Sequence, residues 1–251
     1  MTRRRLRRLG NVLVVVGVVA IAYAAAVVLW RDPVTDLYAR WKQHQLSEAL
    51  ERSFEAYRAQ PIQIPSADAP GSVSQPATAP RLRPLRQVVL DWQKGLEPGD
   101  PLGRIIIPKL DIHPVFVNGT RWGPDLTRGP GQYERTALPG LGRVTAIAGH
   151  RTTFGAPFRH IDRLEPGDVI TLEMPYGTFR YIVFSHKIVK SDDWSIIRER
   201  GFETLVLSAC HPLYSSSQRW IVFARLARVE RADAPSPATT VERDAVASSK
   251  R

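Results

Sequence analysis

The first quarter of the chain carries two different apolar patterns in succession. Residues 9–30 form an apolar run without a charged side chain, and a helix needs about 20 such residues to cross ~30 Å of hydrocarbon. Over residues 31–60, large apolar side chains instead recur every three to five positions, which predicts a juxtamembrane helix with one apolar stripe. We favour a solvated spacer for this second helix. The alternatives are packing on the folded domain, on the bilayer surface or on another copy.

Two later segments lack the side chains that build a core. Residues 61–84 are rich in Pro, Ala, Ser and Gln, which predicts a disordered linker that holds the following domain away from the membrane. Residues 232–251 have the same character and are predicted to form a disordered tail. Residues 85–231 therefore remain as a single folded domain of ordinary size.

Within residues 85–231, short apolar runs rich in branched side chains alternate with Gly, Pro and Asp. Such runs predict strands, and the predicted helices are few and short. This pattern favours an all-β fold, a closed or nearly closed barrel, over an α/β fold. The predicted strands are 103–107, 114–118, 142–149, 168–174, 178–189, 203–209 and 219–229, and the predicted helices are 124–128, 158–164 and 192–200.

The formal net charge of +11 raises the question of a nucleic-acid partner. Five arginines fall within residues 1–8, and most other basic residues are interspersed with acidic ones, so no nucleic-acid partner is expected. Arginines before an apolar span predict a cytoplasmic N-terminus and an extracellular domain on a single-pass anchor. Residues 9–30 exceed the 7–15 apolar residues typical of a signal peptide, so we favour an uncleaved anchor over cleavage near Ala24.

An exported domain with one cysteine is unusual, because extracellular cysteines generally pair in disulfides. Cys210 is the only cysteine and closes the apolar run 204–209. By composition alone it is as readily a small core residue as a functional thiol. Its position where a strand gives way to a polar loop favours the functional thiol.

Two further residues at predicted strand ends supply what a nucleophilic thiol needs. His150 closes the run 144–149 and offers a general acid or base near neutral pH. Arg219 begins the strand after the Cys210 loop, and its planar cation can stabilise developing negative charge. Alone, each is more often an ordinary surface residue. The remaining histidines and Cys210 show no metal-ligand spacing, so no metal or other cofactor is expected.

Together these segments resemble the sortase family. The resemblance covers residues 100–228 and rests on three segments: Gly149-His150-Arg151-Thr152-Thr153, Leu207-Ser208-Ala209-Cys210-His211-Pro212 and Arg219. The pattern is most similar to class E sortases of high-GC Gram-positive bacteria. The resemblance implies a closed β-barrel of about eight strands with short helices. It further implies that Cys210 is the nucleophile, His150 the general acid and base, and Arg219 the stabiliser of the oxyanion and substrate.

The resemblance also implies partners and substrates. A C-terminal sorting signal of the LPxTG or LAxTG kind would be cleaved between Thr and Gly through a thioester. The acceptor amine would come from lipid II, a peptidoglycan cross-bridge or a pilin lysine, and the substrates would be surface proteins.

Two positions depart from the family pattern. Ala209 stands where threonine is common, and Phe154 stands where class E members tend to have tyrosine. We therefore name Ala209, Phe154 and His211 as candidate substrate-binding residues. His211 has a supporting role, because neighbouring side chains on a strand face opposite ways.

Two other functions remain open. An L,D-transpeptidase of the cell envelope also uses a cysteine, but there the histidine precedes the cysteine and an arginine follows closely, whereas here His211 follows Cys210. An anchored, non-catalytic scaffold protein is the second alternative, and retention of Cys210, His150 and Arg219 argues against it.

Overall fold

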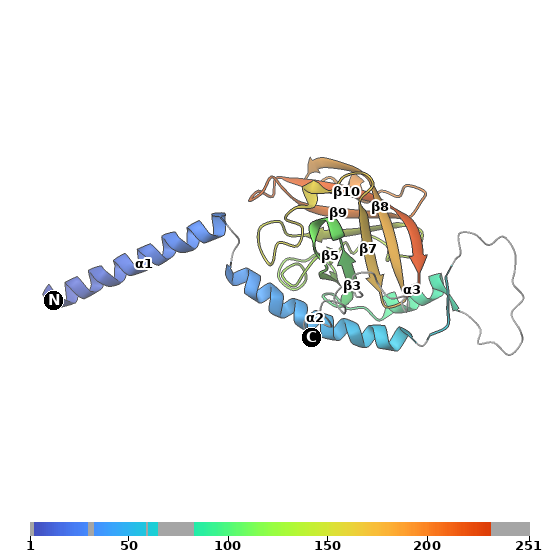
Figure 1. The fold of residues 1–251 in the computed structure, drawn as a ribbon, viewed down its shortest axis with the longest axis horizontal. Coiled ribbons are helices and arrows are strands. Elements are labelled where there is room, and N and C mark those ends of the chain that lie inside the picture. Colours follow the sequence, from blue (N-terminus) through green and yellow to red (C-terminus); the bar gives the residue numbers. More distant parts are fainter. Residues whose placement is uncertain (1–2, 30–32, 59, 65–82, 232–251) are drawn as a thin grey trace, which may run out of the picture.

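Two long helices lead into a β-barrel in the computed structural model, which describes residues 3–29, 33–58, 60–64 and 83–231 (Figure 1). Helix α1 covers Arg3–Leu29 and helix α2 covers Pro33–Arg58. The predicted anchor falls on α1, where residues 7–25 are long and apolar enough to cross a membrane by length and composition. This helix fits a single-pass membrane anchor.

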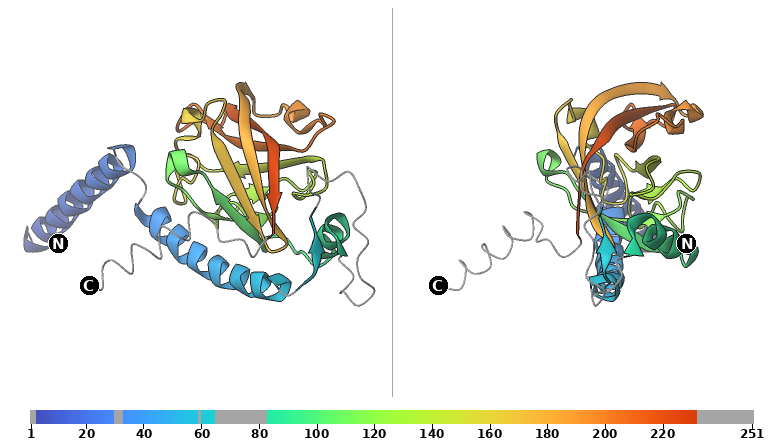
Figure 2. Two further views of the ribbon diagram at one scale, coloured as in Figure 1. Left: turned by 45° about the vertical axis from the view of Figure 1, so that its right-hand side comes forward. Right: turned by 90° about the vertical axis from the view of Figure 1, so that its right-hand side faces the viewer.

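Eight strands close into a barrel in the order β10-β8-β7-β3-β4-β5-β6-β9 (Figures 1 and 2). All neighbouring pairs are antiparallel except β4–β5 and β6–β9, which run parallel. The prediction of a closed all-β barrel with few helices is confirmed. The strands are β3 (Pro101–Ile106), β4 (Val115–Asn118), β5 (Gly131–Gln132), β6 (Val144–Gly149), β7 (Val169–Met174), β8 (Gly177–Lys190), β9 (Thr204–His211) and β10 (Gln218–Glu230).

The strands differ in how many of their faces are covered. In β7, the fully buried Ile170, Leu172 and Met174 alternate with partly exposed residues, as expected for a strand with one face in the barrel. Strand β9 is instead buried on both faces. Its Leu205 and Leu207 belong to the interior core, whereas Val206 packs outside the barrel in a second cluster. This double burial explains why β9 reads as a continuous apolar run.

The second cluster of β9 is covered by η3 (Trp194–Ile197), a 3-10 turn that contributes Ile196. The other short turns are η1 (Pro108–Leu110) and η2 (Ile161–Arg163). The helices predicted at 158–164 and 192–200 are therefore reduced to η2 and η3, and 124–128 is a series of turns. Among the elements that the sequence left unpredicted are the two-residue strand β5 and helix α3 (Leu85–Lys94), which buries Leu85, Val88 and Val89.

The juxtamembrane helix α2 packs along the barrel (Figures 1 and 2). Leu46 and Leu50 are 6% and 0% exposed and cluster with Val115 and Val117 of β4. The amide of Gln43 donates to the carbonyl oxygens of Val115 (2.9 Å) and Arg128 (2.8 Å) and accepts from the Val115 N–H (2.8 Å). The prediction of a solvated spacer is wrong. An apolar stripe on a helix is compatible both with exposure to solvent and with packing, and the stripe of α2 packs against β4.

The segment predicted as linker begins and ends at the same place on the domain. Strand β1 (Ile62–Gln63) pairs in parallel with β2 (Arg83–Pro84), and Ile62 is buried in the barrel core. Helix α2 docks on the barrel before this segment begins. Residues 65–82, and the predicted disordered tail 232–251, lie outside the described residues.

Docking of α2 predicts a measurable loss of stability when its buried contact is removed. Leu50→Ala should lower the free energy of unfolding by ~2–5 kcal/mol, through lost burial and the cavity left behind. Urea titration of the detergent-solubilised chain, followed by tryptophan fluorescence, measures this. The matched control is Leu37→Ala, because Leu37 lies on the same helix and is 71% exposed. Equal effects of both variants would mean that α2 does not pack on the barrel.

Candidate active site

Three neighbouring strands bring together the residues singled out in the sequence. Strand β9 lies between β6 and β10 in the barrel. Arg219 is the direct partner of Cys210 in the β9–β10 ladder, and Gly149 is the partner of Ala209 in the β6–β9 ladder. His150 and Cys210 each follow one residue after that last pair. Neighbouring strands lie about 4.8 Å apart, so Cys210 has His150 on one side and Arg219 on the other.

Cys210 shares the outer face of β9 with Val206 and Ser208, since side chains alternate along a strand. Ser208 is 1% exposed and lies 3.2 Å from the hydroxyl of Tyr133. Cys210 itself is a free, partly exposed cysteine. The thiol therefore lies on the outer surface of the barrel, at the end of the well-packed strand β9.

His150 is enclosed by aromatic rings. The Trp122 ring meets it edge-to-face with centroids 5.3 Å apart, and the Phe154 ring lies at the same distance, tilted by 39°. This burial lowers the pKa of His150 below its ordinary value of 6.5, because a charged ring would lose its hydration. Its Nε2 atom is buried and has no hydrogen-bond partner. A buried ring nitrogen left unpaired costs about 1–3 kcal/mol, and such groups concentrate at functional sites.

The glycine before His150 is required by close packing. A Cβ atom at Gly149 would lie 2.4 Å from the ring of Phe158, which is fully buried in the core. The Phe158 N–H in turn donates to the carbonyl oxygen of His150 at 2.9 Å. The backbone of the His150 loop is thereby fixed to the barrel at the residue whose side chain reaches the site.

Arg151 ties the same loop to the strand that carries the thiol. It is 3% exposed, and its guanidinium donates to the carbonyl oxygens of Cys210 (3.3 Å) and Arg159 (3.2 Å). It also pairs with Asp162 at 2.9 Å. Because one side chain holds both the Cys210 backbone and the His150 loop, Arg151 maintains the spacing between the thiol and the imidazole.

The Arg219 guanidinium points along the loop between β9 and β10. It donates to the carbonyl oxygens of Ser216 (2.8 Å) and Gln218 (2.9 Å). Both acceptors are exposed to solvent. The guanidinium is thus oriented at the strand end next to Cys210 with donors to spare, since its fork carries five N–H groups.

The three remaining candidates lie in different surroundings. Phe154 packs on His150, and the His211 ring lies 5.6 Å from that of Trp220 and 3.5 Å from the Arg151 guanidinium. Ala209 is 2% exposed and belongs to the interior core. Its methyl group faces away from the Cys210 side of the strand, and this burial does not support a direct contact of Ala209 with substrate.

Sequence reasoning missed two neighbours of the site. Trp122 is 69% exposed although it covers His150, and its signal was a lone aromatic residue in the glycine-rich loop 119–123. Tyr133, which reaches Ser208, was not singled out as a site residue from the sequence. No group of three His, Cys, Asp or Glu side chains suited to a metal ion occurs among the residues that the structure describes.

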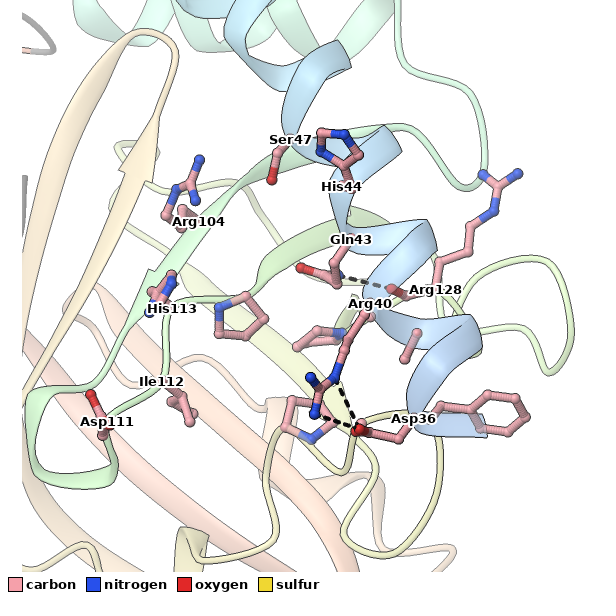
Figure 3. A pocket seen from close by; sticks show the side chains of 17 residues that line it. Asp36, Arg40, Gln43, His44, Ser47, Arg104, Asp111, Ile112, His113 and Arg128 are labelled. Atoms are coloured by element: carbon pink, nitrogen blue, oxygen red, sulfur yellow. Dashed lines mark hydrogen bonds and ion pairs between the residues drawn. The ribbon is translucent and has the colours of Figure 1, made fainter. Parts of the chain in front are cut away.

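A cavity lies beside this site and not over it. It has a volume of about 380 Å³ and is bounded by α2 on one side and by Arg104 of β3 and the loop residues 111–114 and 128–130 on the other (Figure 3). Phe154, Gly155 and Pro157 of the His150 loop border it. Cys210, His150 and Arg219 are not part of its lining.

A closed eight-stranded barrel with a cysteine, a histidine and an arginine at adjacent strand ends defines a narrow class of proteins. Residues 105–227 match the family described as Sortase domain. The chain is 34% identical over 133 residues to sortase D of Bacillus subtilis (strain 168), covering 51% of this chain and 65% of the relative. It is 33% identical over 157 residues to sortase SrtE1 of Streptomyces coelicolor, covering 54% and 45%.

A solved structure agrees with these matches. The crystal structure of sortase E1 from Streptomyces coelicolor, with a tripeptide in its active site, superposes with a TM-score of 0.53 at 28% identity. It covers 58% of this chain and 99% of that one. The barrel of this protein therefore matches the sortase domain over residues 105–227 and is similar to sortases D and E. The chain spans less than two thirds of the length of the two sequence relatives.

The buried imidazole predicts a pH dependence of stability. The unfolded chain takes up this proton near pH 6.5, whereas the folded chain does so only at lower pH. The contribution of His150 to stability is therefore complete above pH 6.5 and is lost as the pH falls from 6.5 toward the folded pKa.

Urea unfolding of wild type and His150→Gln across this pH range measures the effect. The free-energy difference between them should change below pH 6.5 and stay constant above it. An NMR titration of the His150 ring with a midpoint at or above 6.5 would contradict the prediction.

Proposed function

We propose that this protein is a sortase-type cysteine transpeptidase, with Cys210 as nucleophile, His150 as general base and acid, and Arg219 as the stabiliser of substrate and oxyanion. The observation that carries the proposal is the side-by-side position of these three residues at the neighbouring ends of β6, β9 and β10. Membership of the sortase domain supports it, since sortases join proteins to amines through a thioester.

The first half-reaction forms a thioester. The neutral His150 ring takes the proton of the Cys210 thiol, and the thiolate attacks the carbonyl carbon of the threonine in a Thr–Gly bond. The oxyanion that develops accepts hydrogen bonds from the Arg219 guanidinium, which exchanges one of its two loop carbonyls for the substrate. The C–N bond then breaks, and the imidazolium gives its proton to the departing glycine amine.

The second half-reaction reverses the roles. An incoming amine attacks the thioester, and the neutral ring removes a proton from it. The new amide forms as the C–S bond breaks, and the imidazolium returns its proton to the Cys210 sulfur. The low pKa of His150 suits both steps, because it keeps the resting ring neutral near pH 7 and lets the imidazolium part readily with its proton.

The substrates follow from the chemistry of this site. We propose surface proteins that end in an LPxTG- or LAxTG-like sorting signal, with lipid II, a peptidoglycan cross-bridge or a pilin lysine as the source of the amine. Phe154 and His211, which flank the His150–Cys210 pair, are proposed to contact the sorting signal. The mechanism needs no metal or cofactor, because the thiol, the imidazole and the guanidinium supply the nucleophile, the proton carrier and the oxyanion partner.

The proposed location is the outer face of the cell membrane. Five arginines within residues 1–8 precede the apolar run of α1, and Arg31 is the nearest basic residue after that run. Such an imbalance keeps the N-terminus in the cytoplasm. The barrel would then face the cell wall, where both the sorting signals and the acceptor amines occur.

Replacing the nucleophile should abolish the covalent intermediate. Wild-type protein incubated with a panel of LPxTG- and LAxTG-like peptides should gain the mass of the acyl fragment on Cys210, located by peptide mapping. Cys210→Ala should gain none, while its circular dichroism and melting temperature stay near those of wild type, because Cys210 is partly exposed. Peptide cleavage retained by the alanine variant would move the nucleophile elsewhere.

The guanidinium geometry should matter more than its charge. Arg219→Lys keeps the cation but loses the planar fork, so acyl transfer should fall by about 100-fold or more, comparable to loss of an oxyanion donor. Steady-state rates with a sorting peptide and a short glycine peptide as acceptor measure this. Arg225→Lys, on the same strand but six residues beyond Arg219, is the matched control. Wild-type turnover by Arg219→Lys would assign oxyanion stabilisation to another group.

A further inference from the structure

The loop after His150 contains three consecutive residues in the left-handed region. The φ angles are 50° at Phe154, 74° at Gly155 and 43° at Ala156. A left-handed conformation costs roughly 1–2 kcal/mol for each residue other than glycine. Two such residues within three positions persist only where the surroundings enforce the conformation, and strain of this kind concentrates at functional sites.

Part of what enforces this turn comes from outside the barrel. The Phe154 N–H donates to the hydroxyl oxygen of Thr35, in the first turn of α2, at 3.0 Å. The Tyr38 ring meets the Phe154 ring edge-to-face at 6.3 Å. A Cβ atom at Gly155 would lie 3.3 Å from that of Ala39, so the helix passes directly over the turn.

The turn is in direct contact with His150. The Phe154 ring lies 5.3 Å from the imidazole, and it also packs edge-to-face on Trp122, the other ring that covers His150. Phe154 thus forms part of the apolar enclosure that excludes water from the imidazole. A change in the backbone of Phe154 changes this enclosure.

We propose that Thr35 is a positioning residue for His150, so that the juxtamembrane helix α2 holds the general base of the transferase in its working environment. The inference rests on the proposed function for the role of His150. It adds that the helix next to the membrane anchor completes the site through Thr35, Phe154 and the ring of His150.

Thr35 lies at the position on α2 where the helix contacts the turn at residues 154–156. Gln43 fixes the middle of the helix, and Figure 3 shows its amide directed at the backbone of Arg128. Asp36 is paired with Arg40 on the helix itself, at 2.8 Å. Within the first turns of α2, Thr35 therefore supplies the hydrogen bond to the strained turn.

Arg219 donates to two loop carbonyl oxygens, and three ion pairs lie on the loops and the helix around the site. Arg151 pairs with Asp162, Arg121 with Asp125, and Asp36 with Arg40. Burial alone accounts for the low pKa of His150. Loosening the enclosure should therefore admit water and raise the His150 pKa toward 6.5.

The test compares three variants of the full-length chain in detergent. Thr35→Val is nearly isosteric and removes the acceptor, Thr35→Ser restores it, and Leu37→Ala changes an exposed residue of the same helix. In Thr35→Val, kcat for acyl transfer should fall about 10-fold or more with KM changed less than about twofold, because misplacement affects the chemical step. The acidic limb of the pH profile should move to higher pH, and Thr35→Ser should recover both properties.

A second variant approaches the contact from the loop. Gly155→Ala places a methyl group in the left-handed region against Ala39, so it should displace the turn and change kcat and the pH profile in the same direction as Thr35→Val. Melting temperatures of all variants show whether a loss of activity reflects unfolding. A purely structural role for Thr35 would lower stability and leave the pH profile of the folded fraction unchanged.

The outcomes separate this inference from the proposed function, because the His150 ring can be titrated by NMR without substrate. A raised His150 midpoint in Thr35→Val supports the coupling even if wild type transfers no acyl group, which would refute the transpeptidase. Normal transfer by wild type, with the same kcat and the same His150 midpoint in Thr35→Val, would overturn the coupling and leave the transpeptidase intact. Equal effects of Leu37→Ala and Thr35→Val would also overturn it.

Discussion

The parallel pairing of β6 with β9 is the constraint on which the rest of the site depends. It sets Gly149 opposite Ala209, so that both strands end at the same level and the next residues, His150 and Cys210, lie side by side. A register shift of one residue would turn Cys210 into the barrel core and bring Ala209 to the outer face. The shift is opposed by burial of β9 on both faces, since Leu207 fills the interior while Val206 fills the outer cluster. Core packing therefore fixes the chemistry at the rim.

Around this ladder, the loops hold the reactive groups with few but specific contacts. Arg151 joins the Cys210 backbone to the His150 loop, and Phe158 occupies the space that the missing side chain of Gly149 leaves. The imidazole is kept dry by rings from two separate loops, whereas the thiol and the guanidinium stay accessible. This division suits acyl transfer, in which the proton carrier benefits from exclusion of water but the nucleophile must meet a large substrate.

Much of this arrangement could be predicted from the sequence, because it depends on short local patterns of apolar and polar residues. Cys210, His150 and Arg219 each lie where an apolar run meets a polar loop. Such strand ends can be recognised from the sequence alone. The burial of Ala209 was also predictable, since alternation along β9 puts it opposite to Cys210. Docking of α2 was not predictable. The partners of Gln43 are backbone atoms 72 and 85 residues away, and no residue type at those positions reveals that their carbonyls are free. The apolar stripe of α2 fits a solvated helix and a packed one equally well.

The pairing of β1 with β2 has a consequence for how this protein can vary. Because Arg83 pairs with Ile62 in a two-residue ladder, and Ile62 is anchored in the core, these two positions are held side by side and the chain that joins them closes a loop. The entropy of closing such a loop grows only with the logarithm of its length, so each doubling costs about 0.6 kcal/mol. Homologous chains are thus free to lengthen or shorten this stretch, and a fluorophore or affinity tag inserted there would leave the geometry at the barrel rim intact.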